Sequence, residues 1–140
     1  GLLASADFLE AVLGHRAVMP TLAYGQRVSR PGFHVMETPS EHWVETLTGL
    51  GATGVEVMLA YIADRPRQGH PLVPVLQGTC DAELQRRFGA DLDFTLGSET
   101  GAENLLELAF EAASGRLEPK LSLQGNVDFQ LTRGLLGISM

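Results

Sequence analysis

The feature that most constrains this chain is an alternation between short apolar runs and segments with helical spacing, which begins at Phe33. Glycine and proline separate most of these segments, as they commonly do at the ends of strands and helices. Such alternation favours an α/β fold, because a helix can cross over the sheet between two parallel strands. The runs that predict strands are residues 33–37, 55–62, 72–76, 93–96 and 127–131.

We therefore expect a single three-layer, Rossmann-like domain with a mostly parallel or mixed sheet of about five strands. Thr38-Pro39-Ser40-Glu41 has the pattern of a capping box and predicts a helix that begins there. Residues 81–88 predict a short helix, and a second capping box at 100–103 predicts a longer one that ends at Gly115. Only residues 63–71 join the second and third predicted strands, whereas a parallel crossover usually needs a dozen or more residues. We expect those two strands to be antiparallel or not to be neighbours.

The chain divides into an N-terminal helix and linker, residues 1–32, and an α/β domain, residues 33–140. It opens at Gly1 and carries no signal-peptide pattern, so we expect a piece of a longer protein. Cys80 is the single cysteine, which rules out an internal disulfide and, without a signal, favours a cytoplasmic location.

Composition excludes several classes of partner. A net charge of −7 with ten Lys and Arg disfavours a nucleic-acid partner, which needs a basic face. No apolar run approaches the roughly 20 residues that a membrane span needs, and no basic amphipathic stretch indicates a membrane surface. The 140 residues, 44% of them hydrophobic, can form one domain with a real core.

Polar side chains lie beside the predicted strands. Glu37 closes the first strand, and ligands of open α/β sheets bind beyond the carboxyl ends of strands. Its carboxylate could serve as a base, as a metal ligand or only as a cap. His70 lies in a loop with Asp64, Arg65 and Arg67, a combination that can hold a carboxylate substrate or simply be solvated.

Other motifs carry less information. Residues 49–54 match the G-x-G-x-x-G pattern of dinucleotide-binding folds, but a predicted helix precedes them and a strand follows. That order is the reverse of the one that phosphate binding requires, so it favours helix termination. Cys80 is expected to be a small, partly buried thiol. The histidines His34, His42 and His70 have no metal-ligand spacing among themselves.

Several segments, taken in order, resemble the C-terminal domain of the altronate and galactarate dehydratases, also called UxaA-type hydrolases. The family has a Met-Asp-(Ser/Thr)-Pro strand end, similar to residues 35–39, and a helix that finishes Gly-x-x-Ala-x-Gly, similar to residues 48–54. The family's Asp is Glu37 here, and its Thr-Gly-x-Gly turn falls on residues 62–65, which lack both glycines. Further similar segments are residues 70–76, 91–93, 113–115 and 127–130.

The resemblance implies a lyase that dehydrates sugar acids. Such a hydro-lyase removes the proton next to the substrate carboxylate and expels the neighbouring hydroxyl as water, which yields a 2-keto-3-deoxy acid. The resemblance also implies a divalent metal, iron or manganese, and N-terminal and middle domains in the same chain that complete the active site. It assigns catalytic roles to Glu37 and His70, and substrate contacts to Thr38, Ser40, Asp64 and Arg65.

Two other functions stay open. The nearly all-round apolar helix at 103–114 and the apolar tail at 135–138 favour a structural or oligomerisation domain without catalysis, with a second copy of the chain as a candidate partner. The glycine run at 49–54 motivates a third hypothesis, a Rossmann-like nucleotide-binding module.

Overall fold

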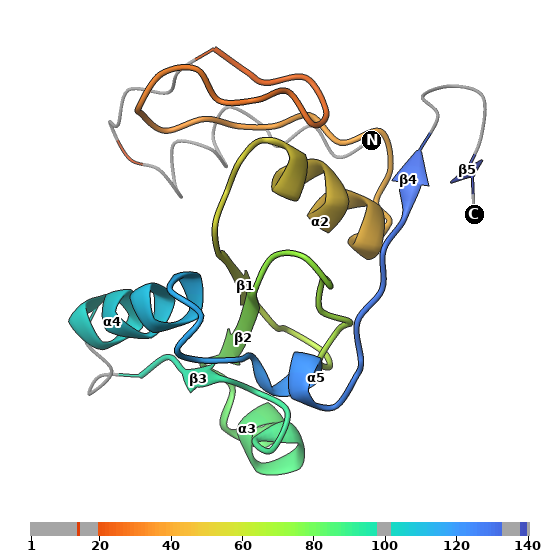
Figure 1. Cartoon of the computed structure of the whole chain (residues 1–140). Helices are drawn as coiled ribbons and strands as arrows, with labels where there is room; N and C mark the ends of the chain where they lie inside the picture. The colour runs from red at the N-terminus through yellow and green to blue at the C-terminus, as the bar shows by residue number, and fades with distance from the viewer. Residues whose placement is uncertain (1–13, 15–19, 98–101, 133–137, 140) are drawn as a thin grey trace.

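The computed structural model describes residues 14, 20–97, 102–132 and 138–139, and these have an α/β fold (Figure 1). The expected N-terminal helix, apart from Gly14, and the first half of the box at 100–103 lie outside the described residues. In chain order the elements are α2 (Trp43–Ala52), β1 (Met58–Tyr61), β2 (Val75–Thr79), α3 (Ala82–Phe88), β3 (Phe94–Thr95), α4 (Ala102–Ala113), α5 (Lys120–Leu123), β4 (Leu131–Thr132) and β5 (Ile138–Ser139).

The sheet in the described part has three parallel strands in the order β1-β2-β3, and β4 and β5 form a separate antiparallel pair. Two of the predicted strands do not join it. The segment at 33–37 is extended, and it pairs with Leu22, whose N–H donates to Val35 O at 2.8 Å and whose O accepts from Glu37 N at 2.9 Å. Val127 makes a single bridge to Gly69. These segments find partners outside the sheet, so the sheet is smaller than the expected five strands.

The expectation that the second and third predicted strands are antiparallel or apart is wrong. β1 and β2 are parallel neighbours, with Met58 opposite Val75 and Tyr61 opposite Gly78. The error came from the strand boundaries, since β1 ends at Tyr61 and β2 begins only after Pro74. The true connection is residues 62–74, which is long enough for a parallel crossover. Pro74 has no N–H to give to a neighbouring strand, which fits a start at the next residue.

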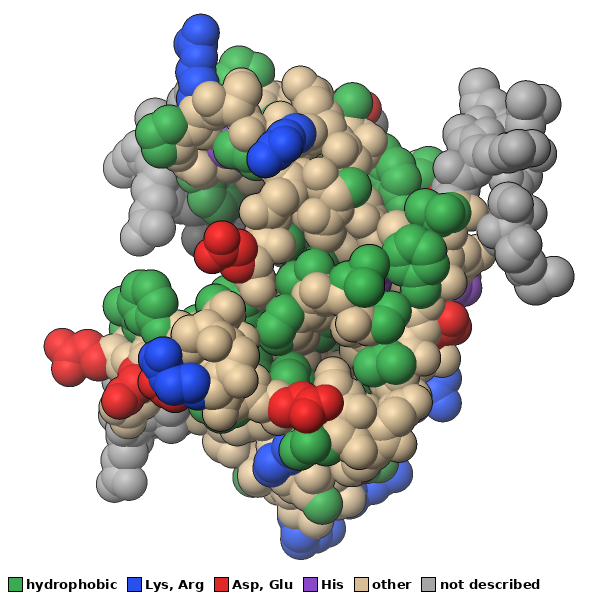
Figure 2. Space-filling model, viewed as in Figure 1, with side chains coloured by type: hydrophobic (Ala, Val, Ile, Leu, Met, Phe, Trp, Pro, Cys, Tyr) green, Lys and Arg blue, Asp and Glu red, His purple; other side chains and the backbone are tan. Residues whose placement is uncertain are grey.

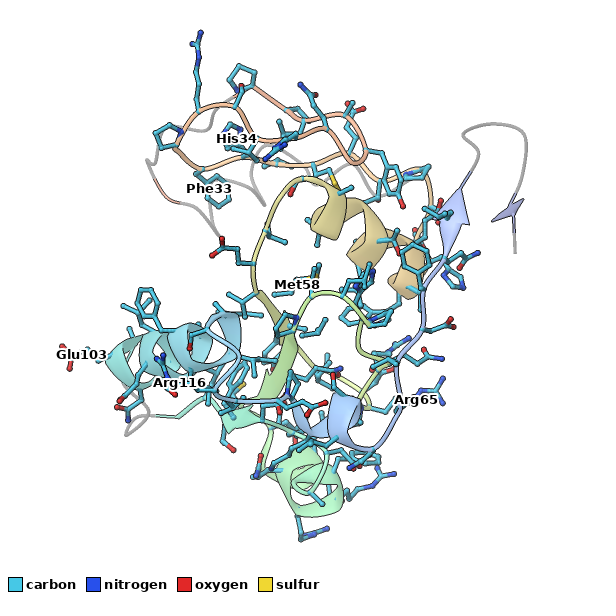
Figure 3. The ribbon with its side chains drawn as sticks, in the orientation of Figure 1. Phe33, His34, Met58, Arg65, Glu103 and Arg116 are labelled. Atoms are coloured by element: carbon cyan, nitrogen blue, oxygen red, sulfur yellow. The ribbon has the colours of Figure 1, made fainter. Side chains whose placement is uncertain are left out.

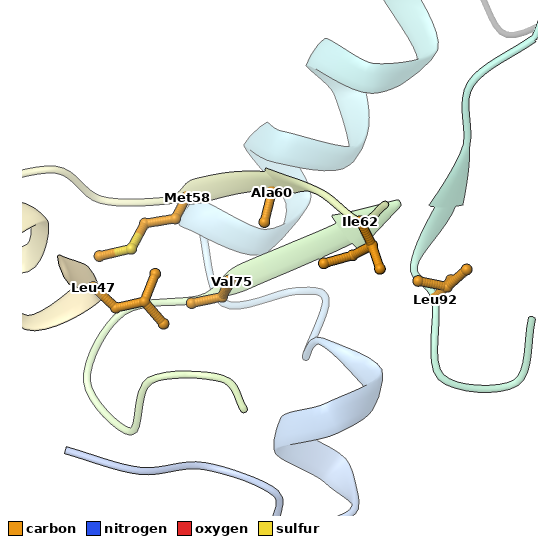
Figure 4. Close-up of a cluster of buried hydrophobic side chains, with 6 residues drawn as sticks. All are labelled: Leu47, Met58, Ala60, Ile62, Val75 and Leu92. Atoms are coloured by element: carbon orange, nitrogen blue, oxygen red, sulfur yellow. The ribbon is translucent and has the colours of Figure 1, made fainter. Parts of the chain in front are cut away.

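The core lies between α2 and the sheet. Val75 is almost fully buried on β2, and Met58, Ala60 and Ile62 point to the same side from β1 and its end (Figure 4). Leu59 and Tyr61 alternate with them and are about half exposed, since β1 is an edge strand. β2 is buried along its whole length, as expected of a central strand. The core cluster comprises Leu47, Met58, Ala60, Ile62, Val75 and Leu92.

The start of α2 also corrects the sequence analysis, because the helix begins at Trp43 and not within the box at 38–41. The hydroxyl of Ser40 makes the side-chain hydrogen bonds just before the helix begins. Its Oγ accepts from His42 N at 3.1 Å and donates to the carboxylate of Glu45 in the first turn. The indole N–H of Trp43 donates to Gln68 O at 2.7 Å and ties this end of the helix to the β1–β2 connection. That long-range contact has no local sequence signature.

The short helix predicted at 81–88 is confirmed as α3, with Asp81 as its N-cap. None of the helices in the described ranges combines the length and apolar character that a bilayer crossing needs.

Candidate functional site

A pocket of about 260 Å³ lies where the chain leaves β1 and enters the β1–β2 connection. This is the carboxyl end of a parallel strand, where ligands of α/β folds usually bind. The segment just before α2 and the first residue of that helix form the opposite wall. We call this the β1-end pocket, and it is lined by Glu41, Trp43, Tyr61, Ile62, Ala63, Asp64 and Arg67.

An ion pair forms the polar side of the β1-end pocket. Arg67 Nη2 lies 2.8 Å from Asp64 Oδ2, and Arg65 N donates to Asp64 Oδ1 at 2.7 Å. The backbone N–H of Arg65 and the guanidinium of Arg67 together hold the pKa of Asp64 below its usual value. A guanidinium has five N–H donors, so after the contact with Asp64 it retains donors for a second carboxylate.

The backbone of Arg67 is fixed by the centre of the sheet. Gln77, fully buried on β2, accepts from Arg67 N at 2.9 Å and donates from Nε2 to Arg67 O at 2.5 Å. Gln77 N in turn donates to Asp93 Oδ2 at 2.8 Å. The side-chain amide of Gln77 is therefore hydrogen-bonded to the backbone of the loop that it holds. The backbone at Arg67 is fixed in this way before any ligand binds.

Tyr61 brings a hydroxyl to the same pocket. Its Oη lies 3.1 Å from Cys80 Sγ, which follows the neighbouring strand β2. The hydrogen bond with Cys80 is the main cause that raises the pKa of Tyr61 above its ordinary value, so the phenol is neutral at physiological pH. Cys80 itself is exposed, not partly buried as expected. A neutral phenol can donate to or accept from a substrate hydroxyl.

The structure does not bring the residues predicted from sequence together in this pocket. Asp64 lines it, whereas Glu37, Thr38 and Ser40 are exposed on the segment before α2 and are not among its lining residues. Arg65 is also exposed and lies at the outer edge of the connection (Figure 3). Its side chain points away from the body of the molecule, and only its backbone N–H reaches Asp64.

His70 belongs to a different pocket. The backbone of Gly69 pairs with the segment at 126–128, through Gly69 N to Asn126 O at 2.9 Å and Asp128 N to Gly69 O at 3.1 Å. The chain thus turns inward, and His70 is only 5% exposed, against the ring of Phe129. Burial lowers the pKa of His70, so the ring is neutral at pH 7. His70 and Asp64 do not line one pocket.

The described residues do not fit a metal site. Among them, no group of three or more His, Cys, Asp or Glu side chains is placed to hold an ion. Asp64 is engaged by Arg67, and His70 lies between apolar side chains. A metal ion would need ligands from outside the described residues.

The glycine run ends a helix, as its order in the sequence indicated. Gly49 and Gly51 lie in the second half of α2, and Gly54 follows the C-cap Thr53 with a φ of +99°. The amide groups that bind phosphate are at the other end of a helix. The interpretation of this motif as helix termination is confirmed.

Sequence reasoning named both arginines of this loop and chose Arg65 as the substrate contact, whereas the structure places Arg67 in the pocket. It did not identify Glu41, Trp43 and Tyr61 as pocket residues. The spacing of Asp64 and Arg67 allows an ion pair across one turn, which was an available signal. No pattern in the sequence indicates that Tyr61 lines the pocket, because its position there depends on where β1 ends.

A protein-family model described as D-galactarate/altronate dehydratase, C-terminal, matches residues 11–135 of the chain. No curated protein matches the chain.

Proposed function

Because the chain belongs to the D-galactarate/altronate dehydratase C-terminal family, we propose that it forms part of a hydro-lyase for sugar acids. The observation that carries the proposal within this chain is the β1-end pocket, whose lining combines the Arg67–Asp64 ion pair with the side chains of Glu41 and Tyr61. A sugar acid offers a carboxylate for the arginine and hydroxyls for the other side chains.

The proposed reaction removes the proton on the carbon next to the carboxylate and expels the hydroxyl of the following carbon. Arg67 holds the carboxylate and stabilises the negative charge that develops on it when the proton leaves. Asp64 keeps the guanidinium in place, and Tyr61 binds a substrate hydroxyl. Loss of water leaves an enol, which takes up a proton to become a 2-keto-3-deoxy acid.

The base is proposed to be a carboxylate of the segment before α2. Glu41 lines the pocket, while Glu37 is exposed four residues earlier and is the acid/base candidate that the sequence indicates. Thr38 and Ser40 are proposed as oxygen contacts, and Arg65 as an outer contact at the edge of the β1–β2 connection. His70 is buried in another pocket and is left out of the proposed site. A divalent metal, iron or manganese, is proposed only through the family, and no step above depends on one.

We further propose that N-terminal and middle domains of the same chain close the exposed side of the β1-end pocket. Glu41, Tyr61 and Asp64 of its lining are exposed, which supports a site that is shared. We also propose that the complete protein has the larger layered sheet expected from the sequence. Its proposed location is the cytoplasm.

The experiment measures dehydration of galactarate and altronate by the complete enzyme, followed as formation of the 2-keto acid. We expect turnover with at least one of them, a large loss of kcat in Glu41→Gln, and a smaller loss in Glu37→Gln. Normal turnover in both variants would remove this segment from the mechanism. Absence of the 2-keto product with both substrates would contradict the proposed reaction.

The second candidate, a structural or oligomerisation domain, is favoured by exposed apolar side chains on α4. Leu106 and Phe110, one turn apart, are 58% and 62% exposed. Surfaces of this kind commonly lie in protein interfaces. Sedimentation velocity of the chain, with Phe110→Ser as the comparison, tests this function: an assembly that the substitution dissociates supports it, and a monomer in both cases argues against it.

A further inference from the structure

A separate pocket, of about 240 Å³, lies in the loop that precedes α2 and shares no lining residue with the β1-end pocket. In Figure 1 this loop lies above α2, on the side of the helix away from the sheet. We call it the loop pocket. Pro20 and Leu22 contribute its apolar wall, and its polar wall consists of Thr21, Gln26, Ser29, Arg30 and His34.

The segment that forms the loop pocket is basic, although the chain as a whole is acidic. The chain has 17 Asp and Glu and a net charge of −7, yet none of these acids lies between Glu10 and Glu37. The described part of that stretch contains Arg27, Arg30 and His34, and blue side chains are visible on the upper part of the molecule in Figure 2. An anion in the loop pocket would therefore meet a guanidinium and no carboxylate in the wall.

Several hydrogen-bond donors in this wall are free. The guanidinium of Arg30 and the hydroxyls of Ser29 and Thr21 make no hydrogen bond or ion pair with any described residue. Gln26 adds a further donor, because its Oε1 accepts from Ala23 N at 2.9 Å and its Nε2 is left without a partner in the described part of the chain. The four side chains are exposed, so a ligand from solution can reach them.

The backbone on both sides of the loop pocket is tied to the rest of the chain. Leu22 is buried and makes the two backbone hydrogen bonds to the extended segment described above. Val28 N donates to Thr53 O, just after α2, at 3.0 Å. His34 Nε2 donates to Arg30 O at 3.0 Å and so fixes the backbone that carries the guanidinium. The donors thus stand on a backbone that is held in place before a ligand binds, which lowers the entropic cost of binding.

We propose that the loop pocket binds a phosphate group, either as inorganic phosphate or as the phosphate of a small monoester. The tetrahedral phosphate presents acceptor oxygens on all sides, which suits donors that come from both ends of the loop. Arg30 supplies the opposite charge, and Thr21, Gln26 and Ser29 donate to the remaining oxygens. The site uses no residue of the proposed dehydratase reaction, so it stands or falls separately from that function.

Titration of the unmodified chain with inorganic phosphate, at constant ionic strength and followed by amide NMR, tests the proposal. We expect saturable shifts that are centred on the residues of the loop pocket. Arg30→Met should weaken binding by about ten- to a hundredfold, as expected for a lost hydrogen bond to a charged group. Arg27→Met is the matched control, because Arg27 lies on the same loop and carries the same charge but does not line the pocket. It should leave the affinity nearly unchanged.

A second variant tests the polar wall without removing an arginine. Gln26→Glu keeps an oxygen that accepts from Ala23 N, so the loop keeps this contact, but it replaces the free donor with a carboxylate. The phosphate-induced shifts should disappear in Gln26→Glu. Absence of saturable shifts in the unmodified chain, equal weakening by Arg27→Met and Arg30→Met, or undiminished binding in Gln26→Glu would each overturn the proposal.

Two further probes define the ligand. Methyl phosphate represents a monoester: an affinity close to that of inorganic phosphate assigns the site to phosphate esters, and much weaker binding assigns it to the free ion. Either result supports a phosphate site. Acetate has fewer acceptor oxygens and should bind more weakly than inorganic phosphate, so acetate binding of equal strength would overturn the assignment to phosphate.

Discussion

Gly49 and Gly51 lie two positions apart on α2 and meet very different surroundings. A Cβ on Gly49 would clash with the Tyr24 ring, whose hydroxyl donates to Glu45 O at 2.7 Å. A Cβ on Gly51 would make only ordinary contacts, the nearest with Val73 at 3.4 Å. Gly51→Ala should raise the free energy of unfolding by up to about 1 kcal/mol through helix propensity. Gly49→Ala should lower it by about 1–3 kcal/mol, because the packed ring must move. Urea unfolding of the two variants checks this, and equal stability of both would contradict the packing described.

His70 should make the stability of the chain depend on pH near neutrality. Burial lowers its pKa in the folded state, while the unfolded chain has the ordinary value of about 6.5. As the pH falls through that value the unfolded state takes up a proton that the folded state does not, so stability is full above it and declines below. Asp64 and Glu111, whose pKa values are lowered, lose their contributions only at much lower pH, around 4 and below.

We expect the unmodified chain to lose more stability between pH 7.5 and 5.5 than His70→Leu does. Urea unfolding at the two pH values measures the difference. An identical loss in both proteins would show that His70 is not held neutral by burial.

Single residues could be predicted where the signal is local. Asp64 stands with arginines in a polar loop, and that pattern alone placed it near a binding site. Only the contacts of Gln77 distinguish the role of Arg67 from that of Arg65. The buried side chain of Gln77, ten residues later in the sequence, fixes the backbone of the loop at Arg67. The direction of each arginine therefore depends on tertiary structure that spacing does not contain.

The helix α3 depends on its cap. Asp81 accepts from Glu83 N at 2.7 Å and Leu84 N at 3.0 Å, and the helix has only seven residues. Asp81→Ala should lower the free energy of unfolding by about 0.5–2 kcal/mol, since two helix-end N–H groups lose their acceptor. Asp81→Asn keeps an acceptor oxygen and should cost much less. Thermal unfolding of the pair distinguishes them, and equal losses would show that the charge, not the cap, stabilises α3.

Whether a segment forms a helix or a strand was easier to predict from the sequence than the residues at which it begins and ends. The cap of α3 is a local signal, and the helix was found at its true start. The start of α2 was misplaced because Ser40, and the long-range bond from Trp43 to Gln68, decide it. The parallel pairing of β1 and β2 was missed since strand ends a few residues off changed the length of the connection.

Across the whole molecule, the chain separates a polar pocket at the end of β1 from an apolar pocket around His70. Sequence alone had joined Asp64 and His70 in one loop and one site. The pairing of Gly69 with the segment at 126–128 separates them, and a contact between residues so far apart in sequence has no pattern that reveals it. The family, in contrast, was evident from the order of several short motifs and is confirmed.

The most direct test of the account compares two arginines of the complete enzyme. Arg67 pairs with Asp64 in the β1-end pocket, while Arg116 pairs with Glu111 at the end of α4, on the other side of the molecule from Arg65 (Figure 3). We predict that Arg67→Met lowers kcat/KM for the sugar acid by about ten- to a hundredfold, as expected for a lost hydrogen bond to a charged group. Arg116→Met should leave kcat/KM unchanged. Equal activity of the two variants would contradict the assignment of the substrate carboxylate to the β1-end pocket.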